Sequence, residues 1–501
     1  MQFIININMI RYVSRNHILF IFPLLLLWNG PLSLIVAHET FHSGKTNAII
    51  ESHFVQKNYS YGGVGEVHSA TIAQASNGTL VCAFYGGTEE GENDVGIYVS
   101  RFNGSSWSTP ERIDNINGSG PVCWNPVIFQ PKRSGAPLLL WYKVTGSPTS
   151  GWAGVIRTST DAGQSWSVRT DLPSTSNSYY SAFGAQYIGP TKDKPLEMPD
   201  GSLLLGSSWE IGGSDYRIHI EKQDNSDYTQ GYSLFWGPYS SGYTARMDGY
   251  IQPAFLWHSA DKQQLQMVVR RGVGKETHTS FSDDGGKTWG PFSVLTASGT
   301  RGAVQAGIDA QTLDNGWHVV AGSQGGTRDR GIAVVISQDG ISWQQALRLD
   351  DQDPPQGQAG HRTEYPSMIL DNQNKLQLVY TAGDHVPGST GRGRNKKNIL
   401  HVVLDPDVLT GGTTSSGSRT AMTAGMQSRF AAWSSGAAMT IDLPAAGRYL
   451  LTMNTLQGKC IALRADVSGR VKVPVSNLPS GAYFIRISGN NRNYLYRFAV
   501  K

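Results

Sequence analysis

The chain has 501 residues, including 58 glycines, and 16% of its residues are charged. A formal net charge of +4 is too small to indicate nucleic-acid binding, for which we would expect a clustered basic face. This composition permits a large buried core and does not require disorder.

The N-terminus has the layout of a signal peptide. Arg11 and Arg15 precede an apolar run over residues 18–28, and Ala37 fits a cleavage position after it. The run is too short to span a bilayer, although a membrane anchor is the alternative interpretation. We therefore expect a signal peptide over residues 1–37, no membrane span, and a secreted or cell-surface protein.

A hairpin-like turn recurs through the middle of the chain. Each copy contains residues that tolerate positive φ, and a short apolar, β-rich strand follows it. The six copies fall at residues 77–79, 134–135, 200–201, 261–262, 314–316 and 372–374. A single unit of about four strands cannot bury both of its faces, whereas a ring of six units does so and hides most strand edges. The spacing predicts an all-β fold with a six-bladed β-propeller over residues 55–405.

A second repeat has the pattern Ser-x-Asp-x-Gly-x-x-Trp. Residues 159–166 and 282–289 match it, residues 337–343 are one residue short, and residues 100–107 lack the Asp. In such a box the Asp carboxylate accepts turn amides, Gly supplies an unusual backbone angle, and Trp packs between sheets. We expect these boxes to be structural rather than catalytic.

These Asp-boxes, in phase with six hairpins, resemble those of the sialidase-like (BNR/Asp-box repeat) propeller family. The resemblance covers about residues 60–405 and includes the segments HSATI, NPVIF, IQPAF and HVVLDP at residues 68–72, 125–129, 251–255 and 401–406. It implies a six-bladed propeller that acts on glycans without a cofactor.

The C-terminal part differs from the repeats. Residues 406–430 are rich in Gly, Ser and Thr and are expected to be a linker. Residues 431–501 contain short strands and turns, which predict a small β-sandwich-like domain. The segments GRY at 447–449 and LPSGAY at 478–483 resemble a sorting domain of type IX secretion, which implies the type IX machinery as a partner. A small carbohydrate-binding sandwich is the alternative.

The sialidase resemblance also implies site residues. A sialidase holds its substrate with three arginines and uses a Tyr nucleophile, its Glu base, and an Asp acid/base. Tyr365 matches the nucleophile and Asp94 the acid/base, whereas Gln252 stands where the Glu belongs and His68 near the first arginine. Arg270 or Arg271 matches the second arginine.

The third arginine is matched loosely by Arg328 or Arg330. Because the first arginine and the Glu are missing, a different sugar chemistry is indicated. We hypothesise an exo-glycosidase that releases terminal sugars, with His68, Asp94 and Tyr365 as catalytic residues.

Two alternatives remain open. In a uronate-directed lyase, His68 or Tyr365 would remove a proton while Arg270 and Gln252 neutralise the carboxylate. In a non-catalytic glycan-binding propeller, His68 and Tyr365 would be structural and Asp94 would cap a turn.

Other polar residues near the blade entries are candidates for sugar binding. Together with the residues above, the substrate-binding set is Glu90, Asn125, Lys143, Arg157, Lys194, Glu210, Gln252, Arg270 and Arg330. The basic stretch 392–397 is expected on a solvated loop. No His or carboxylate spacing indicates a metal site.

The three cysteines, Cys82, Cys123 and Cys460, are an odd number without metal-ligand spacing. Buried free thiols are favoured for Cys82 and Cys123, with a disulfide between them as the alternative.

Overall fold

The computed structural model describes residues 42–411, apart from 62–64, 146–151, 212–214, isolated positions between 239 and 275, 301–303, 325–330, 351–362 and 384–395. Beyond residue 431 it describes seven strands. The predicted signal peptide and most of the predicted linker lie outside the described residues. Among the described residues, no helix is long and apolar enough to cross a membrane.

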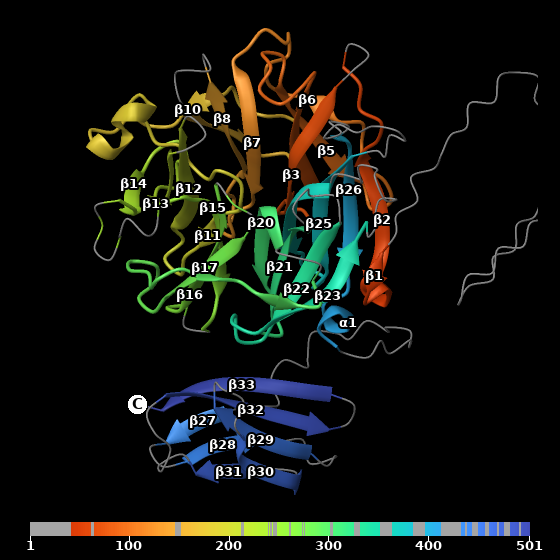
Figure 1. Cartoon of the computed structure of the whole chain (residues 1–501), viewed down its shortest axis with the longest axis vertical. Helices are drawn as coiled ribbons and strands as arrows, with labels where there is room; N and C mark the ends of the chain where they lie inside the picture. Colours follow the sequence, from red (N-terminus) through yellow and green to blue (C-terminus); the bar gives the residue numbers. More distant parts are fainter. Residues whose placement is uncertain are drawn as a thin grey trace, which may run out of the picture. The chain divides into compact units, whose positions relative to one another are not determined.

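Six antiparallel sheets in the described part of residues 42–411 form the blades of a propeller, as predicted (Figure 1). The first three blades consist of β3 (Glu66–Gln74), β4 (Leu80–Gly87), β5 (Gly96–Phe102) and β6 (Glu111–Arg112); β7 (Val122–Phe129), β8 (Leu138–Thr145), β9 (Ala153–Ser159) and β10 (Thr170–Asp171); and β11 (Leu196–Glu197), β12 (Leu203–Ile211), β13 (Asp215–Gln223) and β14 (Tyr232–Trp236). A 3-10 helix, η2 (Ser178–Phe183), precedes β11.

The last three blades repeat this order. They consist of β15 (Tyr250–Trp257), β16 (Leu265–Arg271), β17 (Thr277–Ser282) and β18 (Ser293–Val294); β20 (Val304–Thr312), β21 (His318–Gln324), β22 (Ile332–Ser337) and β23 (Trp343–Leu349); and β24 (Thr363–Leu370), β25 (Leu376–Gly383), β26 (Lys396–Leu404) and β2 (Ile49–Gln56). Two short strands, β1 (Ser43–Gly44) and β19 (Ala297–Ser298), pair with β23, and η1 (Thr46–Ala48) follows β1.

The sixth blade closes the ring with a strand from the other end of the chain. Strand β2 pairs antiparallel with β26, so residues 49–56 complete a sheet whose other strands come from residues 363–404. The propeller therefore begins before the predicted boundary at residue 55. The repeats did not reveal β2 because it precedes the first hairpin turn and its outward-facing positions are exposed.

The six predicted turns all join the first and second strands of a blade. For example, the turn at residues 77–79 joins β3 to β4, and the turn at 372–374 joins β24 to β25. The innermost strand of every blade is therefore the one just before the turn, so the turns indicate which residues of the sequence line the axis.

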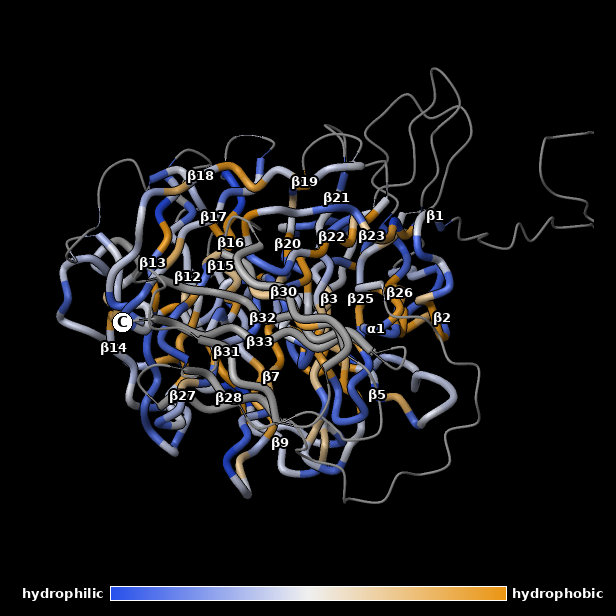
Figure 2. Tube along the Cα trace, turned by 90° about the horizontal axis from the view of Figure 1, so that it is seen from below, coloured by the Kyte–Doolittle hydropathy of each residue, from blue (hydrophilic) through white to orange (hydrophobic). Residues whose placement is uncertain are grey.

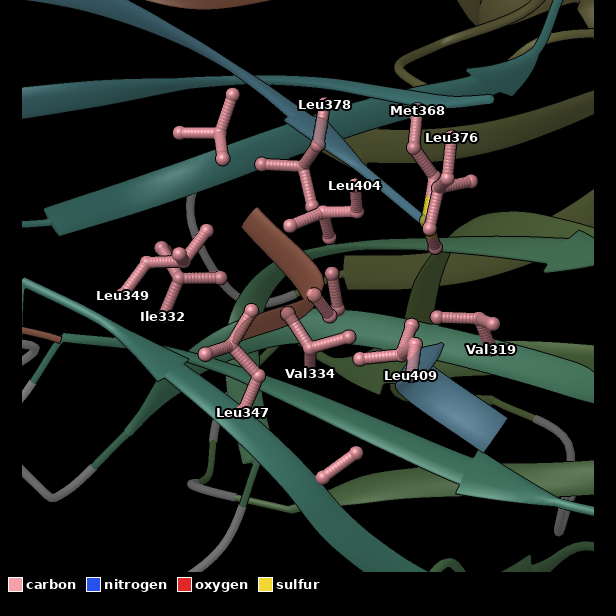
Figure 3. Packing of buried hydrophobic residues seen from close by; sticks show 14 of the residues in the cluster. Val319, Ile332, Val334, Leu347, Leu349, Met368, Leu376, Leu378, Leu404 and Leu409 are labelled. Atoms are coloured by element: carbon pink, nitrogen blue, oxygen red, sulfur yellow. The ribbon is translucent and has the colours of Figure 1, made fainter. Parts of the chain in front are cut away.

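The core lies between adjacent blades, and apolar segments follow the strands while most connecting loops are polar (Figure 2). The close-up in Figure 3 shows one such cluster, in which side chains from the fifth and sixth blades meet Leu409 of helix α1 (Pro406–Thr410). Its labelled members are Val319, Ile332, Val334, Leu347, Leu349, Met368, Leu376, Leu378, Leu404 and Leu409. These side chains are almost fully buried, so blade-to-blade packing stabilises the ring.

The Asp-boxes are structural, as expected. In the box at 282–289, the Asp284 carboxylate accepts the Thr288 amide at 2.9 Å, and the Trp289 indole donates to the Gly286 carbonyl at 2.9 Å. The boxes at 159–166 and 337–343 have the same Ser–Asp contact and the same amide contacts to the Asp. Each box follows the third strand of its blade.

The C-terminal region begins differently from the expected linker. Residues 406–410 form α1, whose N-terminus is capped by the Asp405 carboxylate, and residues 412–431 lie outside the described residues. Among the described residues beyond 431, strands form a three-stranded and a four-stranded antiparallel sheet, consistent with the predicted all-β fold. They are β27 (Ala432–Ser435), β28 (Ala438–Asp442), β29 (Tyr449–Thr455), β30 (Cys460–Val467), β31 (Arg470–Pro474), β32 (Gly481–Gly489) and β33 (Arg492–Val500).

Cys82 and Cys123 are buried free thiols, so the preferred interpretation of these two residues is confirmed.

Candidate functional site

The innermost strands break register near the same point. In β3, β7, β15, β20 and β24 the pairing with the next strand is interrupted a few residues after the strand begins. The interruptions fall between residues 68 and 71, 124 and 127, 251 and 254, 305 and 309, and 364 and 367. A bulge of this kind redirects side chains, and bulges recur beside active sites. The repeat thus gives five blades an equivalent position at one end of the axis.

Four of the bulge residues have a left-handed backbone. Ser69, Gln252, Ala306 and Tyr365 have φ values of 55°, 55°, 45° and 56°. This conformation is unfavourable for residues other than glycine, and it persists only where the surrounding structure holds it. Gln252 and Tyr365, two predicted site residues, are therefore presented in the same way by different blades.

The bulges bring His68, Gln252, Arg270 and Tyr365 together. Arg270 donates from Nη1 to the Tyr365 hydroxyl at 2.9 Å and to Gln252 Oε1 at 3.3 Å. The His68 ring lies against the Tyr365 ring, with centroids 4.2 Å apart. His68 and Tyr365 are 2% and 8% exposed, so these contacts lie in a largely water-excluded environment.

His68 also contacts Glu364, which precedes Tyr365 in β24. Its Nε2 lies 3.8 Å from Glu364 Oε1, and its Nδ1 lies 3.3 Å from the Thr381 hydroxyl. The Tyr85 ring meets the His68 ring edge-on, with centroids 5.6 Å apart. His68 therefore lies between a buried carboxylate and the Tyr365 ring, where an imidazole can exchange protons.

A lysine joins the carboxylates of this region. Lys396 Nζ lies 2.9 Å from Glu90 Oε2, 3.5 Å from Glu66 Oε2 and 4.0 Å from Glu364 Oε1. Desolvation alone would raise the pKa of Glu90, but the charges on Lys396 and His68 outweigh it and lower the pKa to about 2. Glu90 is therefore ionised at neutral pH. We call His68, Glu90, Gln252, Arg270, Glu364, Tyr365 and Lys396 the axial site.

A second polar cluster continues from Gln252 and Arg270 toward the second and third blades. The Ser208 hydroxyl accepts a hydrogen bond from the backbone amide of Gln252 at 3.3 Å and donates to Glu210 Oε1 at 2.7 Å. Lys143 donates to the Thr191 carbonyl, and Asn125 donates to the same oxygen at 3.2 Å. Predicted sugar-binding residues from two further blades, Asn125 and Lys143 of the second and Glu210 of the third, thus adjoin the axial site.

Burial shifts two ionisable groups of this cluster toward their neutral forms. It lowers the pKa of Lys143 to about 7, although the charges of Glu210 and Asp193 oppose the shift. It also raises the pKa of Glu210, against the hydrogen bond from Ser208 and the charges on Lys143 and Arg270. Glu210 and Glu90 are thus two carboxyl groups whose surroundings move their pKa values in opposite directions, a pattern found in acid/base pairs.

Three predicted residues have other contacts. Asp94 accepts the Thr88 amide at 3.0 Å, so its carboxylate caps the loop on which Glu90 lies. Arg157, on the third strand of its blade, forms an ion pair with Asp114 at 3.3 Å. Lys194 forms an ion pair with Asp309 at 2.9 Å, further along the innermost strands. We do not include these three in the axial site, and Arg330 lies outside the described residues.

The residues that sequence reasoning missed are Glu364 and Lys396. Lys396 was expected on a solvated loop, but it is 2% exposed because it begins β26 and points among three carboxylates. This expectation is wrong for Lys396, and residues 392–395 lie outside the described residues. The dipeptides Asn125-Pro126, Gln252-Pro253 and Tyr365-Pro366, which begin seven to nine residues before the hairpin turns, are a sequence signal that could have indicated three of the bulges.

The arrangement can polarise a phenol and move protons, since Arg270 stabilises a Tyr365 phenolate and His68 lies beside it. Within the part of the chain that the structure describes, no group of three or more His, Cys, Asp or Glu residues could hold a metal ion.

Solved structures similar to this chain share its fold. A protein of unknown function from Dyadobacter fermentans DSM 18053 matches with 16% identity and a TM-score of 0.52, over 71% of this chain and 98% of that one. The Hadza microbial sialidase Hz136 matches with 13% identity and a TM-score of 0.52, over 71% of this chain and 68% of that one. No curated protein matches the chain.

The sequence profile of one family covers most of the propeller. The BNR repeat-like domain matches residues 78–378, which include five of the six hairpin turns in full and all but the start of the first. Since this match extends over more than half of the chain, the protein belongs to the family of BNR repeat-like domains.

Proposed function

We propose that this protein is an exported, sialidase-like exo-glycosidase that releases terminal sugars from glycans. The observation that carries the proposal is the contact of the Tyr365 hydroxyl with Arg270 at 2.9 Å, while the Tyr365 ring packs on His68. Membership of the BNR repeat-like family and the likeness to a sialidase in fold support it. The chemistry is argued from the site itself, because one fold hosts many activities.

In this proposal Tyr365 is the nucleophile. Its oxygen forms a bond to the anomeric carbon as the bond from that carbon to the leaving oxygen breaks, and Arg270 stabilises the phenolate charge. Gln252 is an amide and cannot accept the phenolic proton, so His68 takes it. Glu210, whose pKa is raised by burial, protonates the leaving oxygen. Water then attacks the anomeric carbon as the bond from that carbon to Tyr365 breaks, the Glu210 carboxylate takes the water's proton, and His68 returns a proton to the Tyr365 oxygen.

A uronate-directed lyase is the second candidate. The observation that favours it is the side-chain amide of Gln252 beside Arg270. These two groups together can neutralise the carboxylate of a substrate, and the lyase reaction needs no pair of enzyme carboxylates. His68 would then remove the proton α to that carboxylate, the bond to the leaving oxygen on the β carbon would break, and a carbon–carbon double bond would form.

The test is a glycan screen with the full chain and three variants. Sialosides, rhamnosyl-glucuronides and uronic-acid polymers are incubated with the wild type, His68→Ala, Tyr365→Phe and Tyr98→Phe. Released reducing sugar without ultraviolet absorbance indicates the glycosidase, whereas absorbance of an unsaturated uronate indicates the lyase. Tyr98 bonds Tyr59 at 3.0 Å outside the axial site, so its variant controls for loss of a hydroxyl.

We expect His68→Ala and Tyr365→Phe each to lose at least about 10³-fold in kcat, as removal of a nucleophile or its proton acceptor commonly does. Equal turnover by all four proteins would overturn the assignment of the site. Glycan binding by the wild type without turnover would instead support a non-catalytic, glycan-binding propeller.

The C-terminal sheets, on this proposal, serve sorting by the type IX machinery rather than chemistry. Deleting residues 431–501 should then abolish release to the cell surface or medium while leaving kcat unchanged. Normal export of the shortened chain would contradict this role.

A further inference from the structure

The backbone of Tyr365 needs support from outside its own strand. Its φ of 56° is left-handed, and an aromatic residue keeps this conformation only when neighbouring groups hold it. The next residue is Pro366, which has no amide hydrogen with which to bind the adjoining strand. Residues 365 and 366 also fall in the register break between β24 and β25, so the carbonyl groups of this bulge are available to other partners.

Lys192 supplies that support from a different blade. It lies in the segment that leads into β11, and its ammonium group is fully buried. Its Nζ donates to the carbonyl oxygen of Pro366 and to that of Ile308 at 2.6 Å, and it pairs with Asp193 Oδ1 at 2.9 Å. One side chain of the third blade thus connects the bulges of the fifth and sixth blades.

Gly307 packs against Tyr365 from the fifth blade. A Cβ atom at this position would lie 2.6 Å from Tyr365 Cγ and 2.7 Å from its Cα, which is closer than real Cβ contacts allow. The Tyr365 residue is therefore confined on one side by Gly307 and tied through Pro366 to Lys192. Such confinement to a narrow geometry is what a nucleophile requires.

We infer that Lys192 is a positioning residue, whose buried ammonium group sets the Tyr365–Pro366 bulge and so directs the Tyr365 hydroxyl toward Arg270. The alternative is that Lys192 only neutralises Asp193. The kinetic part of the test rests on the proposed function, whereas the spectroscopic part does not.

Lys194 provides a matched comparison. Like Lys192, it pairs with a buried carboxylate, Asp309, at 2.9 Å, and donates to a carbonyl oxygen, that of Ala310, at 2.8 Å. Its ion pair and hydrogen bonds among the described residues go to Asp309 and Ala310 rather than to residues 365 and 366, so its loss removes similar interactions without touching the bulge of the sixth blade. Lys192→Met and Lys194→Met are therefore compared in the full chain.

The activity-independent measurement places 3-fluorotyrosine at position 365 and records its ¹⁹F resonance. We expect Lys192→Met to shift and broaden this resonance clearly, and Lys194→Met to change it much less. At equal loss of Tm, we also expect Lys192→Met to lower kcat at least about tenfold more than Lys194→Met, with KM within about threefold, because a displaced nucleophile slows chemistry rather than binding.

An unshifted resonance in Lys192→Met, or equal effects of the two variants, would overturn the inference. If Lys192→Met does not fold, Lys192→Gln replaces it, because its amide nitrogen is one bond closer to the backbone and uncharged and so cannot hold the carbonyl oxygens of Ile308 and Pro366 as the ammonium group does. A wild-type resonance in that variant together with wild-type kcat would overturn the inference as well. A shifted resonance in a protein that turns over no glycan would refute the proposed function and leave the role of Lys192 standing.

Discussion

The Asp-boxes and the axial site are both built on the blade repeat, but they are held together in different ways. In the boxes that contain an Asp, the contacts of the carboxylate join residues within eight positions of one another, such as Ser282, Asp284 and Thr288. The axial site joins residues from different blades that are up to 306 positions apart, such as Arg270 with Tyr365 and Glu90 with Lys396.

This difference separates stability from chemistry. In each of the three boxes with an Asp, that carboxylate accepts hydrogen bonds from residues of the same box, and the same contacts recur in the second, fourth and fifth blades. At the bulges the backbone is repeated while the side chain changes from blade to blade, from Ser69 to Gln252, Ala306 and Tyr365. Function in this fold therefore resides in differing side chains at equivalent backbone positions.

Among the substitutions that compare the boxes with the site, the largest expected effect is at Arg270. Arg270→Met removes the donor to both Tyr365 and Gln252 while keeping much of the aliphatic volume. We expect kcat to fall by about 10²–10³-fold, as for loss of a preorganised donor to a developing charge. Steady-state kinetics on the glycan found in the screen, with Tm as the control for folding, would measure this. Wild-type kcat would place the chemistry elsewhere.

A substitution in an Asp-box should lower the stability of the fold without lowering kcat. Asp284→Ala removes the acceptor of the Thr288 amide and of the Ser282 and Thr288 hydroxyls. Losing such a capping group should reduce the free energy of unfolding by about 1–2 kcal/mol and leave kcat unchanged. Denaturant unfolding measures the first quantity. A large loss of kcat at unchanged stability would break the distinction between boxes and site.

The degenerate box at residues 100–107 offers a pH test. Trp107 donates to His401 Nδ1 at 3.2 Å, and His401 Nε2 lies 2.7 Å from Gln377 Oε1, so the neutral ring is fully satisfied. Burial, together with the nearby His53, lowers the pKa of His401 to about 3. Near pH 6.5 His401 therefore binds a proton in the unfolded chain but not in the folded chain. The contribution of the neutral His401 ring to the free energy of unfolding is fully present above pH 6.5 and decreases as the pH falls.

Between pH 6.5 and 5.5 this term should cost about 1 kcal/mol of unfolding free energy in the wild type. In His401→Gln the term should be absent, because the amide does not titrate. Denaturant titrations of both proteins at the two pH values measure the difference. Identical pH dependence would mean that His401 carries no such shift.

The smallest expected effect is on the thiols. Cys82 and Cys123 are buried, and burial raises the pKa of each thiol, so neither forms a reactive thiolate in the folded protein. Both should stay unmodified by a thiol reagent until the protein unfolds, as peptide mass spectrometry can check. Rapid modification of Cys82 in the native protein would show that the first blade opens locally.

The fold could be read from the sequence because its determinants are local. Turns such as Asn77-Gly78 and boxes such as residues 282–289 fix backbone geometry within a few residues. Strand β2 was not predicted, because the strand that closes the ring is defined by its pairing with β26, about 340 residues away.

The site was only partly predictable for the same reason. His68, Gln252, Arg270 and Tyr365 occupy motif positions, so the sequence could indicate them as candidates. Lys396 looked like part of a solvated basic run, since only the fold places it beside Glu90 and Glu364. Asp94 matched a motif, but its carboxylate caps its own loop, which sequence cannot distinguish from a catalytic role.

The central claim is that the bulged ends of the innermost strands form a glycan site. A crystal structure of Tyr365→Phe soaked with the glycan that the wild type turns over tests it most directly. The claim predicts the terminal sugar within hydrogen-bonding distance of Arg270 and His68. A sugar bound only at the Asp-boxes or on the C-terminal sheets, with the axial site empty at saturating glycan, would contradict it.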